Sequence, residues 1–165
     1  GWLHTGDQAR IENGHVYITG RIKDILVLSN GEKIPPGDME LAICLAPEIE
    51  QALVVGEGRP YLTALLVLNP EEWRRLADRY ELDADDDESL ASEKLQQHLV
   101  KVVRRRLKDF PGYAKVRRVI PLIEPWSVDN GLLTPTLKVK RAKVLDRYAD
   151  AIDALYTNGP VKRKG

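Results

Sequence analysis

Residues 49–68 read IEQALVVGEGRPYLTALLVL, and this stretch decides the fold class. Two runs rich in Val, Leu and Ile, at 49–55 and 61–68, are separated by the turn-forming sequence Gly56-Glu57-Gly58-Arg59-Pro60. Apolar runs of this length, bounded by glycine and proline, are typical of two strands joined as a hairpin. The stretch therefore predicts an antiparallel strand pair, around which the rest of the chain can be interpreted.

Shorter strands and amphipathic helices flank this pair. Before it, the sequence predicts a hairpin over 11–19 with its turn at 12–14, a strand pair at 25–28 and 33–34, and a helix over 38–45. After it, the sequence predicts helices over 70–80 and 89–108, a strand over 116–123, a turn at 129–131 and a last helix from about 140 to 156. Strands with helices on one side of them predict a small α+β domain with short β-sheets and flanking helices.

Composition excludes several other classes of protein. The 165 residues are 43% hydrophobic and 30% charged, which is typical of a globular protein with a core and not of a disordered chain. The net charge is zero, so the chain as a whole does not attract nucleic acid or an anionic membrane. One cysteine, Cys44, excludes an internal disulfide and favours a reducing, cytoplasmic setting. The chain opens directly into patterned sequence at Gly1, and we expect it to be a piece of a longer protein.

Three separated stretches combine turn formers with charged residues: GWLHTGD (1–7), GRIKDILVLSNGEKI (20–34) and LLTPTLKVKR (132–141). In this order and spacing they resemble the C-terminal part of AMP-forming acyl-CoA synthetases, members of the adenylate-forming superfamily. The likeness is strongest to the long-chain fatty acid–CoA ligases, in which a TPT-x-K-x-KR ending replaces the more widespread SGK version. The resemblance covers nearly the whole chain and implies a ligase that uses ATP, a fatty acid and coenzyme A.

The resemblance assigns the catalytic lysine to Lys138. The family joins a carboxylate to the α-phosphate of ATP and then transfers the acyl group from AMP to the thiol of coenzyme A. A carboxylate with a pKa of about 4 is already ionised at pH 7, so the first step needs charge stabilisation and not a general base. A lysine can lie between both anions and supply that stabilisation. The family's usual glycine before this lysine is Leu137 here, and Arg141 is interpreted as an anchor of the segment.

The other two motifs imply nucleotide and coenzyme A contacts. Asp7 resembles the aspartate that accepts hydrogen bonds from the ribose hydroxyls of ATP or AMP, and Arg21 resembles its partner on the other side of the ribose. Lys23 falls at the family's hinge, about which the C-terminal domain rotates between the two half-reactions. The loop Ser29-Asn30-Gly31 would then face the active site in the second pose. Gly31 would let the pantetheine arm of coenzyme A pass close to bare backbone.

The resemblance also implies a division of the chain. Residues 1–23 correspond to the end of the large N-terminal adenylation domain and the hinge, and residues 24–165 to a small mobile C-terminal lid. The acyl pocket, the phosphate loop and the Mg²⁺ site are expected in the N-terminal domain, which would be the lid's partner, so residues 1–165 alone are expected to be inactive. Peripheral membrane contact of the full-length protein stays open, and no nucleic acid is expected as a partner.

The sequence leaves two alternative functions open. A lid of the same kind could serve an acyl-AMP ligase that transfers its product to a carrier protein. A different class is suggested by a basic set that could bind nucleic acid: Arg104, Arg105, Arg106, Lys108, Lys115, Arg117, Arg118 and the tail 162–164. Aromatic residues are only 6% of the chain and are scattered, which argues against a single-strand binder.

Other polar residues have structural interpretations. Glu40 resembles a common family glutamate, but an acidic residue near a helix N-terminus explains it equally well, so it is left out of the site. His4 and His15 have no partners at metal-ligand spacing. The acidic run at 83–88 has Glu88 where a calcium-binding EF-hand loop needs glycine, and it is interpreted as a surface loop that caps the following helix.

Overall fold

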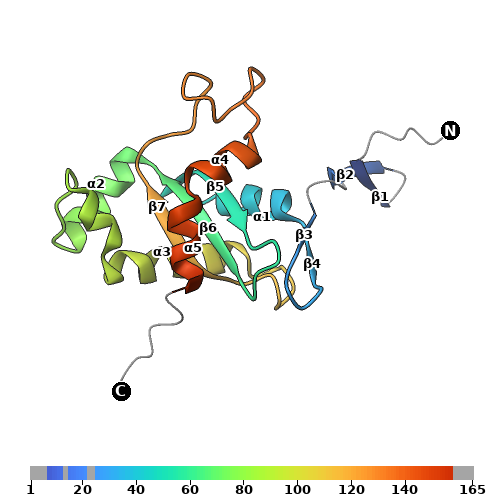
Figure 1. Ribbon diagram of the computed structural model, residues 1–165, viewed down its shortest axis with the longest axis horizontal. Helices are drawn as coiled ribbons and strands as arrows, with labels where there is room; N and C mark the ends of the chain where they lie inside the picture. Colours follow the sequence, from blue (N-terminus) through green and yellow to red (C-terminus); the bar gives the residue numbers. More distant parts are fainter. Residues whose placement is uncertain (1–6, 13–14, 22–24, 158–165) are drawn as a thin grey trace.

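The computed structural model describes the backbone of residues 7–12 and 15–21 and all of residues 25–157. Lys23 and His4 therefore lie outside the described residues. The elements in chain order are β1 (Asp7–Glu12), β2 (His15–Arg21), β3 (Leu26–Val27), β4 (Lys33–Ile34), α1 (Pro36–Ile43), β5 (Ile49–Val55), β6 (Leu62–Leu68), α2 (Pro70–Arg79), the 3-10 helix η2 (Asp87–Ala91), α3 (Glu93–Arg106), β7 (Val116–Leu122), α4 (Arg141–Arg147) and α5 (Ala149–Thr157). Short sheets and flanking helices confirm the predicted α+β class (Figure 1).

A three-stranded sheet in the order β5-β6-β7 forms the centre of the molecule. The predicted pair, β5 and β6, is antiparallel, with Ala52 opposite Leu66. β7 lies parallel to β6, and the connection between them carries α2, η2 and α3. All seven residues of β6 are buried, as expected for a central strand covered on both faces.

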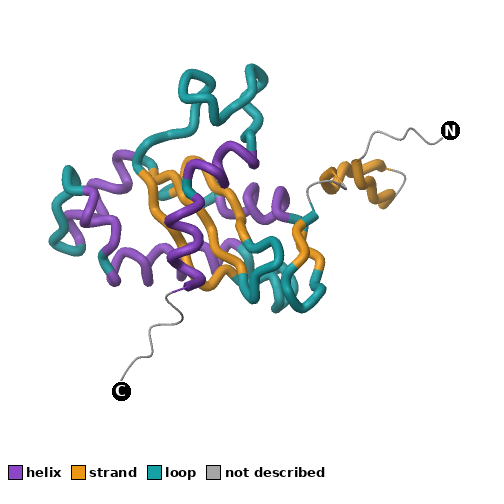
Figure 2. Tube along the Cα trace, in the orientation of Figure 1, coloured by secondary structure: helices purple, strands orange, loops and turns teal. Residues whose placement is uncertain are grey.

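Helices cover both faces of this sheet, so the expectation of helices on one side was wrong. Alternate residues of β5 and β6 point to two separate cores. Val54 and Leu66 pack with α1, α2 and α3, whereas Leu53 and Leu65 pack with α4, α5 and the loop before α4 (Figure 2). The sequences of β5 and β6 contain nearly continuous apolar runs because both faces of these strands are buried.

Two predicted helices are divided in the structure. The segment expected as one helix over 89–108 consists of η2 and α3, separated at Ser92, whose φ of −56° and ψ of 129° are extended. The last helix is divided at Tyr148 into α4 and α5. The amphipathic pattern is continuous across both breaks, because side chains on either side of each break pack against the same sheet.

Two smaller sheets precede the central one. β1 pairs with β2 and β3 pairs with β4, both antiparallel, at the places where the sequence predicts hairpins. In the described part of the chain, no helix is both long enough and apolar enough to cross a membrane.

Candidate functional site

Lys138 lies in an exposed loop, and hydrogen bonds between Thr134 and Lys138 join the two sides of this loop. The Thr134 N–H donates to the Lys138 carbonyl (2.8 Å), and the Lys138 N–H donates to Thr134 Oγ1 (3.0 Å). Leu133 and Val139 form an isolated antiparallel bridge at the base of the loop. These contacts fix the backbone at Lys138, while its side chain is exposed to solvent.

Leu137 has a left-handed backbone conformation, with φ of 62°. This is a conformation that glycine adopts freely and that costs a residue with a Cβ roughly 1–2 kcal/mol. Its N–H donates to the Thr134 carbonyl at 2.8 Å, and its side chain is 70% exposed. Leu137 therefore adopts the backbone conformation of the glycine that the family usually has at this position.

Arg141 ties this loop to the rest of the domain. Its guanidinium donates to Glu40 Oε1 of α1 at 2.7 Å and to the Val54 carbonyl of β5 at 3.2 Å. Glu40 Oε1 also accepts from the Val54 N–H at 2.9 Å. The prediction that Arg141 anchors the segment is confirmed by these contacts.

The interpretation of Glu40 as only a helix-terminus residue was incomplete. Its carboxylate connects α1, β5 and the start of α4, in addition to its place near the beginning of α1. Arg141 lies 101 residues away in sequence, so no local pattern indicates the pair. The resemblance of Glu40 to a common glutamate of the family was the one signal in the sequence that could have identified its role.

The segment Ser29-Asn30-Gly31 is a tight exposed turn between β3 and β4. The Gly31 N–H donates to the Leu28 carbonyl (2.9 Å), and Asn30 Oδ1 accepts from the Glu32 N–H (3.0 Å). Gly31 has a φ of 87°, and a Cβ there would meet no atom within 4 Å. The predicted positive φ is confirmed, and the backbone at Gly31 is open to an approaching ligand.

A second turn, residues 56–60 between β5 and β6, supports this loop. The Ser29 N–H donates to the Arg59 carbonyl (2.9 Å), and the Gly58 N–H donates to the Val27 carbonyl (2.8 Å). Glu57 Oε2 accepts from the Val27 N–H at 2.8 Å. The pantetheine-facing loop of the sequence prediction is thus fixed to the central sheet.

Asp7 and Arg21 are directly opposite each other in the register of β1 and β2. Two residues predicted to contact the same ribose are therefore brought to one place on the backbone. The register shifts at Gln8 and Ala9, next to this pair.

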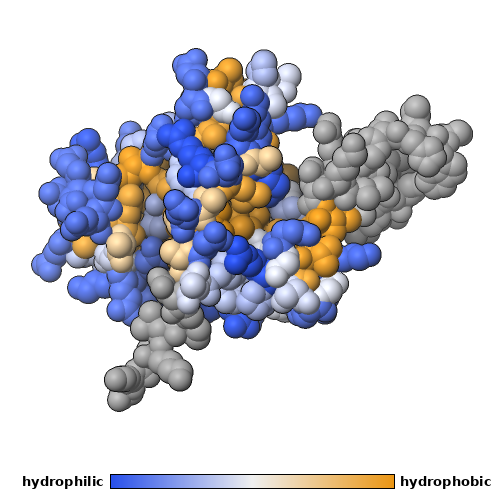
Figure 3. Space-filling model, in the orientation of Figure 1, coloured by the Kyte–Doolittle hydropathy of each residue, from blue (hydrophilic) through white to orange (hydrophobic). Residues whose placement is uncertain are grey.

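The Lys138 loop and the Gly31 turn lie at different ends of the domain, as Figure 1 shows: the segment between β7 and α4 extends at the top, and β3 and β4 lie at the lower right. A pocket of about 270 Å³ lies between them, lined by Leu26, Val55, Glu57 and Arg141 among others. In Figure 3 apolar residues are visible at the surface between the centre of this face and β3.

Cys44 and the acidic run at 83–88 have structural roles. Burial, with a smaller effect of the Glu40 charge, raises the pKa of the Cys44 thiol, so a packing role fits it. The acidic run forms capping turns, with Asp86 Oδ1 accepting from the Glu88 N–H at 3.0 Å. Among the described residues no group of three or more His, Cys, Asp or Glu side chains could hold a metal ion.

The sequence model of the AMP-binding enzyme C-terminal domain matches residues 23–159. The chain belongs to this family.

Its relatives activate carboxylic acids, according to their names. The chain is 32% identical to a chloroplastic long-chain-fatty-acid–[acyl-carrier-protein] ligase of Arabidopsis thaliana over 95% of its own length and 22% of the relative. It is 31% identical to the long-chain-fatty-acid–CoA ligase FadD15 of Mycobacterium tuberculosis over 94% of its length and 26% of that relative. The chain thus spans about a quarter of the length of the relatives it matches.

Among solved structures, the chain is similar to the A domain of a carboxylic acid reductase from Segniliparus rugosus in complex with AMP and a carboxylic acid. The identity is 26% and the TM-score 0.78, over 93% of this chain and 23% of that one. This likeness places the observed fold with the C-terminal region of an adenylate-forming enzyme.

Proposed function

We propose that residues 1–165 are the C-terminal part of an ATP-dependent, AMP-forming long-chain fatty acid–CoA ligase. In this proposal residues 1–23 belong to the N-terminal domain and the hinge, with Lys23 as the pivot, and residues 24–165 form a mobile lid. The observation that carries the proposal is the exposed Lys138 at the tip of a closed loop that Arg141 and Glu40 anchor.

Lys138 would act in the first half-reaction. A carboxylate oxygen of the fatty acid attacks the α-phosphorus of ATP, and the bond to pyrophosphate breaks. Two anions approach each other in this step, so a cation between them lowers the barrier. The rigid backbone at Lys138 supports this role, because a positioned charge costs little reorganisation during the reaction.

The turn at Gly31 would act in the second half-reaction. The thiol sulfur of coenzyme A attacks the acyl carbon, and AMP leaves. The open backbone at Gly31 supports passage of a narrow pantetheine arm. Because Lys138 and Gly31 lie at different ends of one domain, each would face the active site in a different pose of the lid.

The nucleotide contacts of the proposal are Asp7 and Arg21, which would hold the ribose of ATP and then of AMP. Their opposite positions in the β1–β2 register support a shared ligand. The Mg²⁺ that accompanies ATP would be bound by the N-terminal domain. That domain would also cover the exposed apolar side chains of Leu41 in α1 and Leu45 in the turn after it, both 72% exposed.

A carrier protein is the alternative acceptor. The Arabidopsis relative is named for an acyl-carrier-protein substrate and the mycobacterial relative for coenzyme A, at nearly equal identity. Both acceptors present a thiol on a pantetheine arm, so the Gly31 turn fits either. Product analysis with free coenzyme A and with a pantetheinylated carrier protein as competing acceptors separates the two.

The test is a pair of half-reaction assays on the full-length enzyme with Lys138→Ala and the matched control Lys140→Ala, two residues away and also exposed. Acyl adenylate formation by Lys138→Ala should fall about 10²-fold or more, the usual effect of removing one transition-state contact. Thioester formation from pre-made acyl adenylate should change little, and Lys140→Ala should be close to wild type in both assays. Equal adenylation by wild type and Lys138→Ala would remove the main catalytic residue of the proposal.

A further inference from the structure

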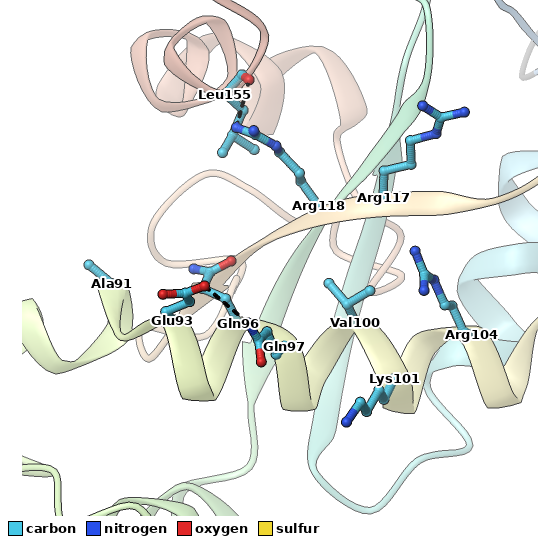
Figure 4. Close-up of a pocket in the computed structure, with 10 residues that line it drawn as sticks. All are labelled: Ala91, Glu93, Gln96, Gln97, Val100, Lys101, Arg104, Arg117, Arg118 and Leu155. Carbon is cyan, nitrogen blue, oxygen red and sulfur yellow. Dashed lines mark hydrogen bonds between the residues drawn. The ribbon is translucent and has the colours of Figure 1, made fainter. Parts of the chain in front are cut away.

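A groove of about 760 Å³ lies between α3, the strand β7 and the end of α5, away from both loops described above (Figure 4). Its volume is in the range of sites for small ligands. It is bounded by α3 on one side and by Leu155 of α5 on the other, with β7 between them.

Four of the ten residues that line the groove are cationic. Lys101 and Arg104 come from α3, and Arg117 and Arg118 come from β7; Glu93 is the one carboxylate among the residues that line this groove. Figure 4 shows Arg104 directed from α3 toward β7. Arg118 donates to the Leu155 carbonyl at 3.1 Å, and the Arg117 guanidinium lies 5.7 Å from the centre of the Tyr61 ring.

A second hollow of about 230 Å³ adjoins the groove and shares Arg104 with it. Lys108 and Lys115 line this hollow together with the apolar residues Leu107 and Phe110. Arg104 therefore lies between a groove lined by four cations and a smaller hollow with an apolar wall.

This clustering is not explained by the overall charge, which is zero. Of the cations in the two hollows, Arg104, Lys108 and Lys115 make no side-chain hydrogen bond or ion pair with any residue that the structure describes. Like charges gathered in a concave surface raise the local positive potential and attract anions. Arginine binds phosphate through two parallel N–H donors, which fixes the anion as well as attracting it.

We propose that the two hollows form a binding site for a small ligand that carries two or more phosphate groups, such as a phosphorylated nucleotide. Its phosphates bind to Arg104, which is directed from α3 toward β7, and to Arg117, and its apolar or aromatic part lies against Phe110. The concave shape favours a small ligand over a membrane, and the lack of several aromatic residues along the groove disfavours a single-stranded nucleic acid. The ligand class does not depend on the function of Lys138. One source of such a ligand is the head group of coenzyme A, and only this source rests on the proposed function.

The test is calorimetric titration of the 165-residue chain with adenosine 3′,5′-bisphosphate at low and at physiological salt. Charge reversal by Arg104→Glu should weaken binding about tenfold or more, because it replaces a phosphate donor by an anion. Arg105→Glu is the matched control, since Arg105 is exposed on the same helix and lines neither hollow. It should change the affinity less than about threefold, which is the effect expected of a remote charge at physiological salt. Arg104→Gln, with no new charge, should give an intermediate affinity.

Two results would overturn the proposal: no saturable binding by the wild type, or an equal loss in Arg104→Glu and Arg105→Glu, which would indicate diffuse surface charge. Saturable binding of duplex DNA or of phosphatidylserine vesicles without binding of the bisphosphate would also overturn it. Further titrations identify the source of the ligand. Coenzyme A binding much tighter than dephospho-coenzyme A assigns the site to the acceptor's head group, whereas equal binding of ATP and the bisphosphate assigns it to free nucleotides. The titration involves no chemistry, so an inactive Lys138 leaves its result unchanged.

Discussion

The ion pair between Arg141 and Glu40 gives the sharpest quantitative prediction. Arg141→Met keeps most of the aliphatic stem and removes the guanidinium. It therefore deletes the 2.7 Å bond to Glu40 and the 3.2 Å bond to the Val54 carbonyl, and keeps the 2.9 Å bond from the Val54 N–H to the Glu40 carboxylate.

The expected loss of stability follows from the burial of the pair. The side chains of Arg141 and Glu40 are 29% and 17% exposed, so the pair is largely but not fully removed from water. A hydrogen bond to a charged group contributes about 1.5–3 kcal/mol, and breaking a fully buried pair costs about 3–5 kcal/mol. We expect Arg141→Met to lower the free energy of unfolding by about 3 kcal/mol, near the bottom of the second range because of the residual exposure.

Urea denaturation of the 165-residue chain measures this loss. With an m value of about 2 kcal/mol/M, the midpoint should fall by about 1.5 M. Arg147→Met is the matched control, because Arg147 and Glu124 form a comparable pair at 3.1 Å whose side chains are 40% and 61% exposed. Exposed ion pairs contribute little to stability, so Arg147→Met should lower the free energy of unfolding by less than about 1 kcal/mol.

A double-mutant cycle with Glu40→Gln decides whether the pair itself is responsible. The two substitutions should couple by about 1 kcal/mol or more, since they remove the same interaction. Additivity within about 0.5 kcal/mol, or an Arg141→Met midpoint equal to that of Arg147→Met, would refute the reasoning.

Three further predictions concern single residues. Leu137→Gly should stabilise the chain by up to about 1 kcal/mol, because glycine relieves the φ of 62° at the cost of a more flexible unfolded chain; a lower thermal midpoint would contradict this. Tyr156→Phe should lower the free energy of unfolding by about 1 kcal/mol in urea, because its hydroxyl donates to the Tyr61 carbonyl at 2.9 Å; an unchanged midpoint would show that this bond contributes nothing. Burial lowers the pKa of His98 below 6.5, against the opposing charge of Glu48 at 4.0 Å. Below pH 6.5 the unfolded chain therefore binds more protons than the folded chain. The stability that the buried, neutral His98 contributes is present above pH 6.5 and is lost as the pH falls through the lowered folded-state pKa. Denaturation at pH 7.5, 6.5 and 5.5 should show a weaker pH dependence for His98→Asn than for wild type, and equal slopes would argue against it.

Local signals were sufficient for the central strand pair. The run from Ile49 to Leu68 carries β-branched and aliphatic residues on both sides of a glycine- and proline-containing turn, and the strands begin and end within a residue of the prediction. The same run also indicates that both faces of these strands are buried, because a strand with one face in water would alternate apolar and polar residues, so helices on both faces were predictable from it.

Helix breaks were not predictable from periodicity. Ser92 and Tyr148 interrupt helices whose apolar pattern continues across them. A break changes the direction of the chain while both halves still bury side chains against one sheet. The hydrophobic pattern records that burial and not the direction of the axis.

The candidate site was also only partly predictable from the sequence. The glycine of the β3–β4 turn was predictable, because a tight turn of this kind needs a positive φ at Gly31. The pair between Glu40 and Arg141 depends on how α4 returns to α1 after more than 90 intervening residues, which is a property of the tertiary structure. Lys138 was identified by family resemblance, and its role in catalysis stays a prediction.

The parallel pairing of β6 and β7 has a consequence for how the chain folds. Residues 69–115 must be made and placed before β7 can join the sheet, so this pairing closes a long loop and raises the contact order. On the ribosome, β5 and β6 can form a hairpin early, but one edge of β6 stays unpaired until β7 has left the exit tunnel. A chain released before residue 122 would therefore expose a strand edge rich in leucine and valine, which is a template for pairing with other chains and hence for aggregation.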